Sequence, residues 1–242
     1  LWTSAAPAAT PEFFTFPTGN LVSNLGVTTD GAGNVWFGAQ LPANGGPQPV
    51  AALARIVPGE ASPGTSNGIT FYPTPNPLNP SCCATQLRNV SYSAKDDRLY
   101  YVRSDGVVGT GDPKAMVPGA ITGMQFTALP GFQDLWDIAA APDGGAWFTE
   151  HSASNVGPTF YGSRVAFYDG GGVTEGPNIA IQNANTAINS QRYDAQPAGI
   201  AVDPKSSRPW FVEENAGLPG YRIATYNGGL SYNEYLAAPC AP

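Results

Sequence analysis

Few side chains in this sequence are suited to acid–base chemistry. His151 is the only histidine, and an imidazole has an ordinary pKa that suits a general base near neutral pH. It directly follows Glu150, and Glu214 follows a similar Trp-Phe pair later in the chain. Carboxylate oxygens are the ligands that Mg²⁺ and Ca²⁺ prefer, so Glu150 and Glu214 are candidate metal ligands if their strands converge. A single histidine after a strand is also typical of a structural or surface residue, and that alternative stays open.

A second group of residues suits ligand binding without catalysis. Arg88, Asp134, Trp136 and Gln196 each stand just before a short alternating segment. An aromatic ring, a fixed cation and an amide on one rim would bind a carbohydrate or another small oxygenated ligand, through stacking on Trp136 and a charge-assisted hydrogen bond from Arg88. The alternative is structural: Trp136 packs between sheets, and Arg88 pairs with Asp134 or Glu150.

Several other chemistries lack their motifs. The chain has no Gly-x-Ser-x-Gly and no phosphate loop of the Gly-x-x-x-x-Gly-Lys type, which leaves acyl transfer and nucleotide hydrolysis unsupported. Its three cysteines, Cys82, Cys83 and Cys240, form no Cys-x-x-Cys pair, so a zinc site is excluded. In an oxidising compartment Cys240 could pair with Cys82 or Cys83. A bridge between the two neighbours and three free thiols are the alternatives.

Composition excludes two classes of partner and favours a turn-rich globular chain. The 242 residues include 29 glycines and 24 prolines, with only 12% charged residues and a net charge of −7. No cluster of Lys and Arg would bind nucleic acid, and no apolar run reaches the roughly 20 residues that span a bilayer. The sequon Asn89-Val90-Ser91, the low Lys content and a start at Leu1 without Met predict a secreted glycoprotein whose signal peptide has been removed.

One pattern recurs four times along the chain. Each copy has a short alternating strand, a turn of Asp, Gly or Pro, and a second strand opened by an aromatic residue, which predicts a β-hairpin. The aromatic anchors are Trp36, Tyr100, Trp147 and Trp210. A third and a fourth strand are expected after each hairpin, at 54–57 and 69–73, 115–117 and 124–127, 164–168 and 173–175, and 221–226 and 230–235.

Four strands per unit define a blade of a β-propeller. We therefore predict an all-β fold, with residues 1–242 forming a single propeller domain of four blades. Five blades are the alternative, because about 48 residues per blade is also an ordinary repeat length. Residues 12–17 resemble an outer strand and are expected to help close the ring. In such a ring the first strands line a central channel, and the segments that lead into them surround one mouth.

The repeat Gly-Ile/Val-x-x-x-x-Asp-Gly-x-x-Trp-Phe-x-Glu resembles that of the streptogramin lyase (virginiamycin B lyase) family of β-propellers. The likeness covers most of residues 12–236. It implies a seven-bladed propeller that opens a macrocyclic lactone by elimination with a divalent metal, using a Glu-Pro-His-Gly-Ile segment and a Glu after Trp-Phe. The matching segment here is 196–200, where Gln196 replaces the Glu and Ala198 replaces the catalytic His. Only Glu214 matches, as the second metal ligand.

These observations leave three functional hypotheses. The first is a secreted, monomeric propeller that binds a glycan or small polar ligand at the channel mouth, near Arg88, Trp136, His151 and Glu214. The second, implied by the family resemblance, is a metal-assisted lyase acting on a lactone or a uronic-acid-containing saccharide. There His151 or Tyr193 would be the base, and Glu150 and Glu214 would hold Mg²⁺ or Ca²⁺. The third is a protein-interaction scaffold that uses its long loops.

Overall fold

The structure is a computed structural model that describes residues 21–42, 49–62, 64–74, 85–129, 134–150, 164–178, 197–213, 222–228 and 231–236. All regular elements in these ranges are β-strands, grouped into four antiparallel sheets of four strands each. No helix in this part of the chain is long and apolar enough to cross a bilayer. The predicted all-β class is therefore confirmed.

Each sheet is a meander in which consecutive strands pair. Sheet 1 contains β1 (Leu21–Thr29), β2 (Val35–Leu41), β3 (Val50–Ile56) and β4 (Ile69–Pro73). Sheet 2 contains β5 (Leu87–Ser93), β6 (Arg98–Arg103), β7 (Val107–Gly111) and β8 (Met124–Ala128). Sheet 3 contains β9 (Leu135–Ala140), β10 (Ala146–Glu150), β11 (Arg164–Tyr168) and β12 (Val173–Asn178). Sheet 4 contains β13 (Pro197–Val202), β14 (Pro209–Glu213), β15 (Arg222–Gly228) and β16 (Ser231–Leu236).

One predicted strand is wrong. Residues 115–117 lie in the connection between β7 and β8, and the third strand of sheet 2 is β7 instead. The sequence of β7 contains Gly109 and Gly111, and glycine is typical of loops rather than strands. Both glycines are required here by packing. A Cβ on Gly109 would lie 2.3 Å from the Tyr101 ring, and a Cβ on Gly111 would lie 2.7 Å from the Met116 sulfur. Glycine is thus used in this strand where other groups approach the backbone closely.

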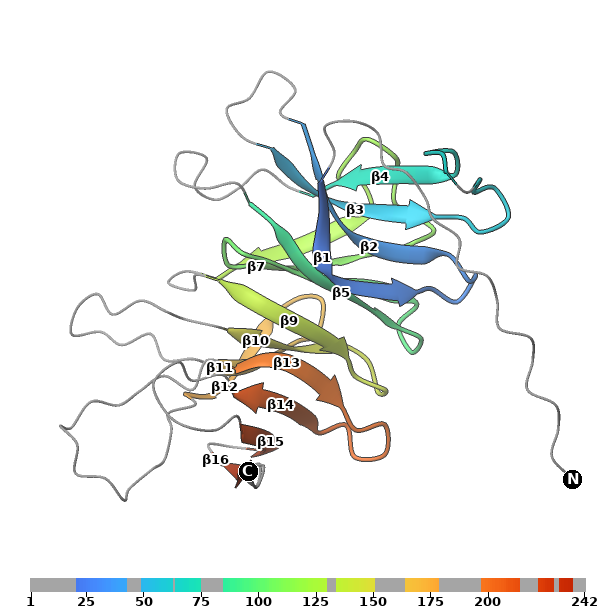
Figure 1. The fold of residues 1–242 in the computed structure, drawn as a ribbon. Helices are drawn as coiled ribbons and strands as arrows, with labels where there is room; N and C mark the ends of the chain where they lie inside the picture. Colours follow the sequence, from blue (N-terminus) through green and yellow to red (C-terminus); the bar gives the residue numbers. More distant parts are fainter. Residues whose placement is uncertain are drawn as a thin grey trace, which may run out of the picture.

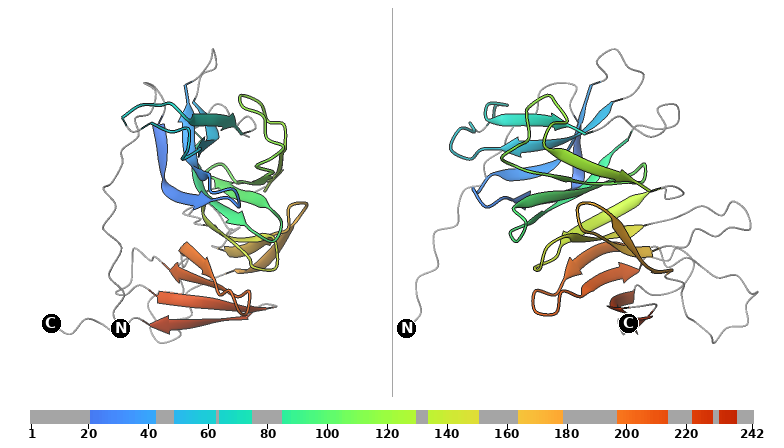
Figure 2. Two further views of the ribbon diagram at one scale, coloured as in Figure 1. Left: turned by 90° about the vertical axis from the view of Figure 1, so that its right-hand side faces the viewer. Right: turned by 180° about the vertical axis from the view of Figure 1, so that it is seen from behind.

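The four sheets follow one another face to face, as propeller blades do (Figure 1). Their first strands β1, β5, β9 and β13 lie side by side in chain order, and each contacts the next. Sheets 1 and 4 lie at opposite ends of this series in every view (Figure 2). The described sheets therefore form an open arc in which neighbouring first strands meet. The closing strand expected at 12–17 lies outside the described residues.

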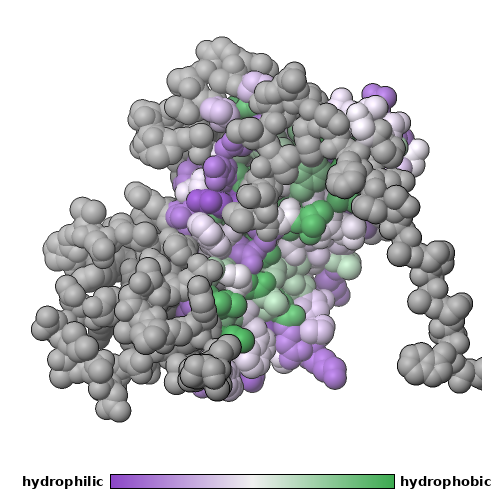
Figure 3. All heavy atoms as spheres, in the orientation of Figure 1, coloured by the Kyte–Doolittle hydropathy of each residue, from purple (hydrophilic) through white to green (hydrophobic). Residues whose placement is uncertain are grey.

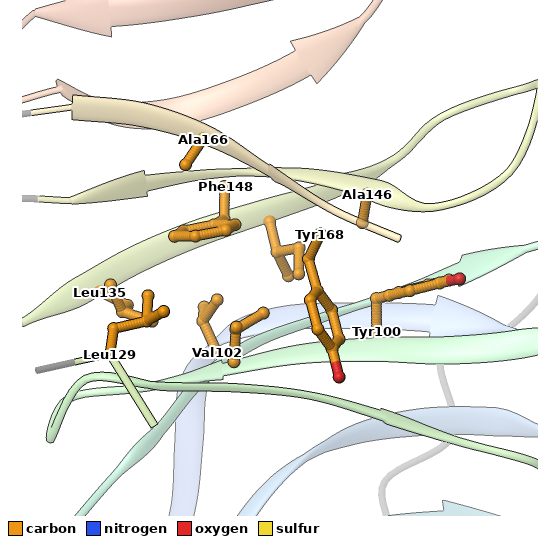
Figure 4. Close-up of a cluster of buried hydrophobic side chains, with 10 residues drawn as sticks. Tyr100, Val102, Leu129, Leu135, Ala146, Phe148, Ala166 and Tyr168 are labelled. Carbon is orange, nitrogen blue, oxygen red and sulfur yellow. The ribbon is translucent and has the colours of Figure 1, made fainter. Parts of the chain in front are cut away.

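Aromatic residues on the second and third strands hold neighbouring sheets together. Tyr100 of β6 meets Tyr168 of β11 edge to face, with ring centroids 6.2 Å apart. Trp147 of β10 meets Tyr226 of β15 in the same way at 5.3 Å. Phe148, the next residue of β10, points back toward sheet 2, where it packs in a buried cluster (Figure 4). Since side chains alternate along a strand, Trp147 and Phe148 lie on opposite faces of sheet 3. Trp147 anchors this sheet to sheet 4, and Phe148 anchors it to sheet 2.

Polar side chains form hydrogen bonds with the backbone of first strands in neighbouring sheets. The Ser91 hydroxyl of β5 accepts a hydrogen bond from Ala140 N of β9 at 2.9 Å. The Thr149 hydroxyl of β10 donates to Ala198 O of β13 at 2.8 Å. These hydrogen bonds satisfy backbone groups that have no partner within their own sheet. They also hold neighbouring sheets at a fixed distance.

Candidate functional site

All four first strands are irregular at the same place. The pairing register shifts between Leu87 and Asn89 in β5, and the residues after Leu135 in β9 shift in the same way against β10. Corresponding shifts occur in β1 and β13. A bulge leaves an extra residue outside the ladder and re-aims its side chain. Arg88 and Trp136 occupy equivalent positions in the bulges of two neighbouring strands, so their side chains leave the regular pattern of the sheet.

The structure brings three of the predicted ligand-binding residues together. Arg88 Nη2 lies 2.8 Å from Asp134 Oδ1 in a salt bridge. The Arg88 guanidinium carbon lies 4.6 Å from the centroid of the Trp136 ring, within cation–π range. All three side chains are partly exposed. The cluster joins sheets 2 and 3, as the repeat predicted, and Arg88 also forms the ion pair with Asp134 that the structural alternative required.

The cluster is rigidly held but not saturated with hydrogen bonds. Asp134 has a φ of 73°, in the left-handed region that is strained for a residue with a side chain. Its backbone N–H donates to Ser104 O at 3.0 Å, so the segment before β9 is fastened to sheet 2. Arg88 Nε is buried, and no acceptor among the described residues bonds to it. This buried donor is unsatisfied and closed to solvent, so the donors that the cluster can present to a ligand are the terminal guanidinium nitrogens.

A polar contact that the sequence reasoning missed lies one residue further along both strands. Asn89 Nδ2 of β5 donates to Asp137 Oδ1 of β9, and Ile200 N of β13 donates to Asp137 Oδ2 at 2.8 Å. Asp137 thus connects three consecutive first strands. Burial raises the pKa of Asp137, although the hydrogen bonds from Ile200, Asn89 and Ile138 oppose the rise. The signal was available, because polar residues stand here where the other two repeats have glycine.

The predicted glycosylation site overlaps this contact. A glycan would be attached to Asn89 Nδ2, the atom that donates to Asp137 between two first strands. On the other side, a Cβ added to Gly26 would fall 1.4 Å from Asn89 Oδ1, which shows how closely β1 approaches. A glycan on this nitrogen would have to pass through the contact with Asp137. We therefore do not propose glycosylation at Asn89.

Of the candidate catalytic and metal-binding residues, only Glu150 lies in the described part of the chain. Glu150 is buried at the end of β10, opposite Leu135, on the face that packs against sheet 2. Within the described ranges, no three His, Cys, Asp or Glu side chains come together as a metal site. His151, Tyr193, Gln196, Glu214 and the three cysteines lie outside the described residues. The base and metal-ligand assignments stay predictions.

A polar recess lies at the opposite end of sheets 2 and 3 from the Arg88 cluster. It has a volume of about 460 Å³ and is lined by Asp96, Arg98, Tyr100, Gln125 and the 169–171 turn. The Asp96 carboxylate is already engaged, since it accepts hydrogen bonds from the Tyr100 hydroxyl and from Gly145 N, both at 2.7 Å. None of the predicted site residues lines this recess. It supplies a matched control for the Arg88 cluster.

Comparisons with known proteins add little to this description. No protein-family model matches the chain, and no curated protein matches it. One solved structure, described as a crystal structure of a mitotic checkpoint complex, contains a chain that aligns with 100% of this chain and 88% of its own length. The two share 10% identity with a TM-score of 0.33, and we base no conclusion on a likeness of that size. The resemblance to streptogramin lyases rests on the repeat motif alone.

Proposed function

We propose that this protein is a secreted binding module that takes a saccharide or another small hydroxyl-rich molecule at the Arg88–Asp134–Trp136 cluster. The proposal depends on one observation above all: a cation, a carboxylate and an aromatic ring from neighbouring sheets meet at the bulges of two first strands. Ligand-binding residues are typically found in partly exposed clusters of this kind, carried by a rigid scaffold.

The chemistry of the cluster favours neutral over anionic ligands. Arg88 supplies N–H donors and Asp134 supplies an acceptor beside them, so the pair can bond two adjacent hydroxyl groups, one accepting and one donating. The carboxylate also cancels most of the Arg88 charge at short range, and the net charge of −7 repels anions at long range. Trp136 holds the guanidinium in a fixed orientation and provides an apolar surface beside it.

Glycan-array screening followed by calorimetry tests this proposal. Arg88→Ala is expected to weaken binding of the best neutral saccharide by about 10- to 100-fold, because hydrogen bonds to a charged group contribute roughly 1.5–3 kcal/mol. Trp136→Ala removes the stacking surface and is expected to weaken binding by about 10-fold. The control Arg98→Ala alters the recess at the other end of the same sheets and should leave the affinity unchanged.

Binding is also expected to survive a chelator and the His151→Ala change. A requirement for a divalent ion would instead favour the lyase hypothesis. An array without any bound saccharide, or an affinity that falls with Arg98→Ala and not with Arg88→Ala, would contradict the proposed site.

A further inference from the structure

The polar recess between sheets 2 and 3 is lined by charged side chains from both sheets. Sheet 2 contributes Asp96, Arg98 and Gln125, and sheet 3 contributes the turn at 169–171 between β11 and β12. Tyr100 lines the recess and also belongs to the buried cluster of Figure 4, so the recess lies directly against the core. Its volume of about 460 Å³ is within the range of small-molecule sites.

The cation of this recess, Arg98, differs from Arg88 in having no carboxylate bound to it. Arg98 is half-buried at the start of β6. Its charge helps to lower the pKa of Asp96, so it lies near that carboxylate. Within the described part of the chain, however, its guanidinium forms neither a hydrogen bond nor an ion pair, whereas Arg88 is paired with Asp134. The Arg98 donors are therefore available to a ligand.

Two ionised carboxylates line the same recess. Gly171 N and Gly172 N donate hydrogen bonds of 2.8 and 2.7 Å to Asp169 Oδ1 and hold the pKa of this carboxyl below its ordinary value. Burial raises the pKa of Asp96, but the hydrogen bonds to its Oδ2 outweigh this effect and lower it. These bonds leave Asp169 Oδ2 and Asp96 Oδ1 as acceptors that no donor among the described residues uses.

Separate charges of both signs in one recess favour a ligand that also carries both signs. Two carboxylates oppose a simple anion, and the guanidinium opposes a simple cation. We propose that this recess binds a free α-amino acid, whose carboxylate accepts hydrogen bonds from Arg98 and whose ammonium group donates to Asp169. Charge-assisted hydrogen bonds of this kind are about twice as strong as neutral ones. The site and the ligand class differ from those of the saccharide proposal, so neither proposal depends on the other.

Calorimetric titration of the full chain with each of the common L-amino acids, at up to about 10 mM, tests the proposal. At least one amino acid is expected to bind. Two analogues of the best ligand, nearly equal to it in shape, remove one charge each: the carboxamide lacks the anion, and the 2-hydroxy acid lacks the cation. Each analogue is expected to bind at least about 10-fold more weakly, because a charge-assisted hydrogen bond is lost.

Two variants assign these preferences to single side chains. Arg98→Gln should abolish the preference for the amino acid over its carboxamide, and Asp169→Asn should abolish the preference over the 2-hydroxy acid. Both variants should fold, because Arg98 gives up no side-chain hydrogen bond and the Asn oxygen can still accept from the two turn N–H groups. Arg88→Ala, at the opposite end of the same sheets, is the matched control and should leave the affinity and both preferences unchanged.

Three results would overturn the assignment. The first is that no amino acid binds in the titrated range, and the second is that Arg98→Gln and Asp169→Asn keep both preferences. The third is that Arg88→Ala weakens amino-acid binding as much as Arg98→Gln does, which would place the ligand elsewhere. Loss of saccharide binding in Arg88→Ala, with amino-acid binding intact, is expected if the two sites are separate.

Discussion

Phe148→Ala is expected to lower the free energy of unfolding by about 3–5 kcal/mol, the range for deleting a fully buried phenylalanine ring. Phe148 is completely buried between sheets 2 and 3, in a cluster with Val102, Leu135 and Tyr168 (Figure 4). The cluster lies in the middle of the arc, where both neighbouring backbones are held by other contacts, so the cavity cannot collapse easily.

Urea unfolding at constant pH measures this effect. Phe126→Ala is the matched control, because this phenylalanine is 45% exposed on β8, and its loss should change stability by less than about 1 kcal/mol. Equal effects of the two substitutions would mean that sheets 2 and 3 do not pack through Phe148.

Asp30→Ala is expected to cost about 3 kcal/mol, because it removes the acceptor of several hydrogen bonds at once. The buried Asp30 carboxylate accepts from Ala32 N at 2.9 Å, from Asn34 N at 3.0 Å and from Asn34 Nδ2 at 2.8 Å. It also accepts from the buried indole Nε1 of Trp36 at 2.8 Å, which would be left without a partner. Asp203→Ala, at the equivalent turn of sheet 4, removes only exposed turn contacts and should have a smaller effect.

The same carboxylate makes a distinctive contribution to the pH dependence of stability. Burial alone would raise the pKa of Asp30, but the hydrogen bonds from Trp36, Asn34 and Ala32 outweigh it and hold the pKa below the ordinary value of 3.8. A group with a depressed folded-state pKa stabilises the protein above its unfolded pKa, and this contribution is lost as the pH falls through the folded-state value. The stability difference between wild type and Asp30→Asn should therefore be constant near neutral pH and shrink below pH 3.8. A difference that persists unchanged in acid would contradict this.

Most of the strand order could be predicted from the spacing of aromatic residues and turns. The four Trp- or Tyr-bearing hairpins are all present, and three of the four third strands lie where they were expected. The exception, β7, was hidden because Gly109 makes room for the Tyr101 ring of the adjacent strand. Such a requirement comes from a side chain on another strand, so no local pattern reveals it.

The sequence identified which residues form the candidate site, but not all of the contacts between the first strands beside it. Arg88, Asp134 and Trp136 were identified because they stand at one position of the repeat, and the structure places them in contact. Asn89 and Asp137 stand out in the sequence as polar residues where the other two repeats have glycine, but their contact depends on how far apart the first strands lie, a distance that is set by packing.

Sequence patterns also do not show which of several equivalent apolar residues are exposed at the surface. Trp210, Ile223 and Tyr235 of sheet 4 are 38%, 48% and 49% exposed. The residues at the same register positions of sheet 1 are Trp36, Leu53 and Tyr72, and they are buried. Over the described part of the chain in the view of Figure 3, hydrophilic and hydrophobic areas alternate without one dominant apolar patch. The exposed set is thus recognised by its equivalence to a buried one, which requires the register of every sheet.

The assignment of the ligand site depends on neighbouring first strands lying side by side. A double-mutant cycle on Asn89→Ala and Asp137→Ala, measured by urea unfolding, tests this placement across sheets 2 and 3. Contacting polar partners couple by about 0.5–3 kcal/mol, and we expect a favourable coupling of at least about 1 kcal/mol, with none between Asn89 and the distant Asp203. Strictly additive effects of Asn89→Ala and Asp137→Ala would contradict the arrangement.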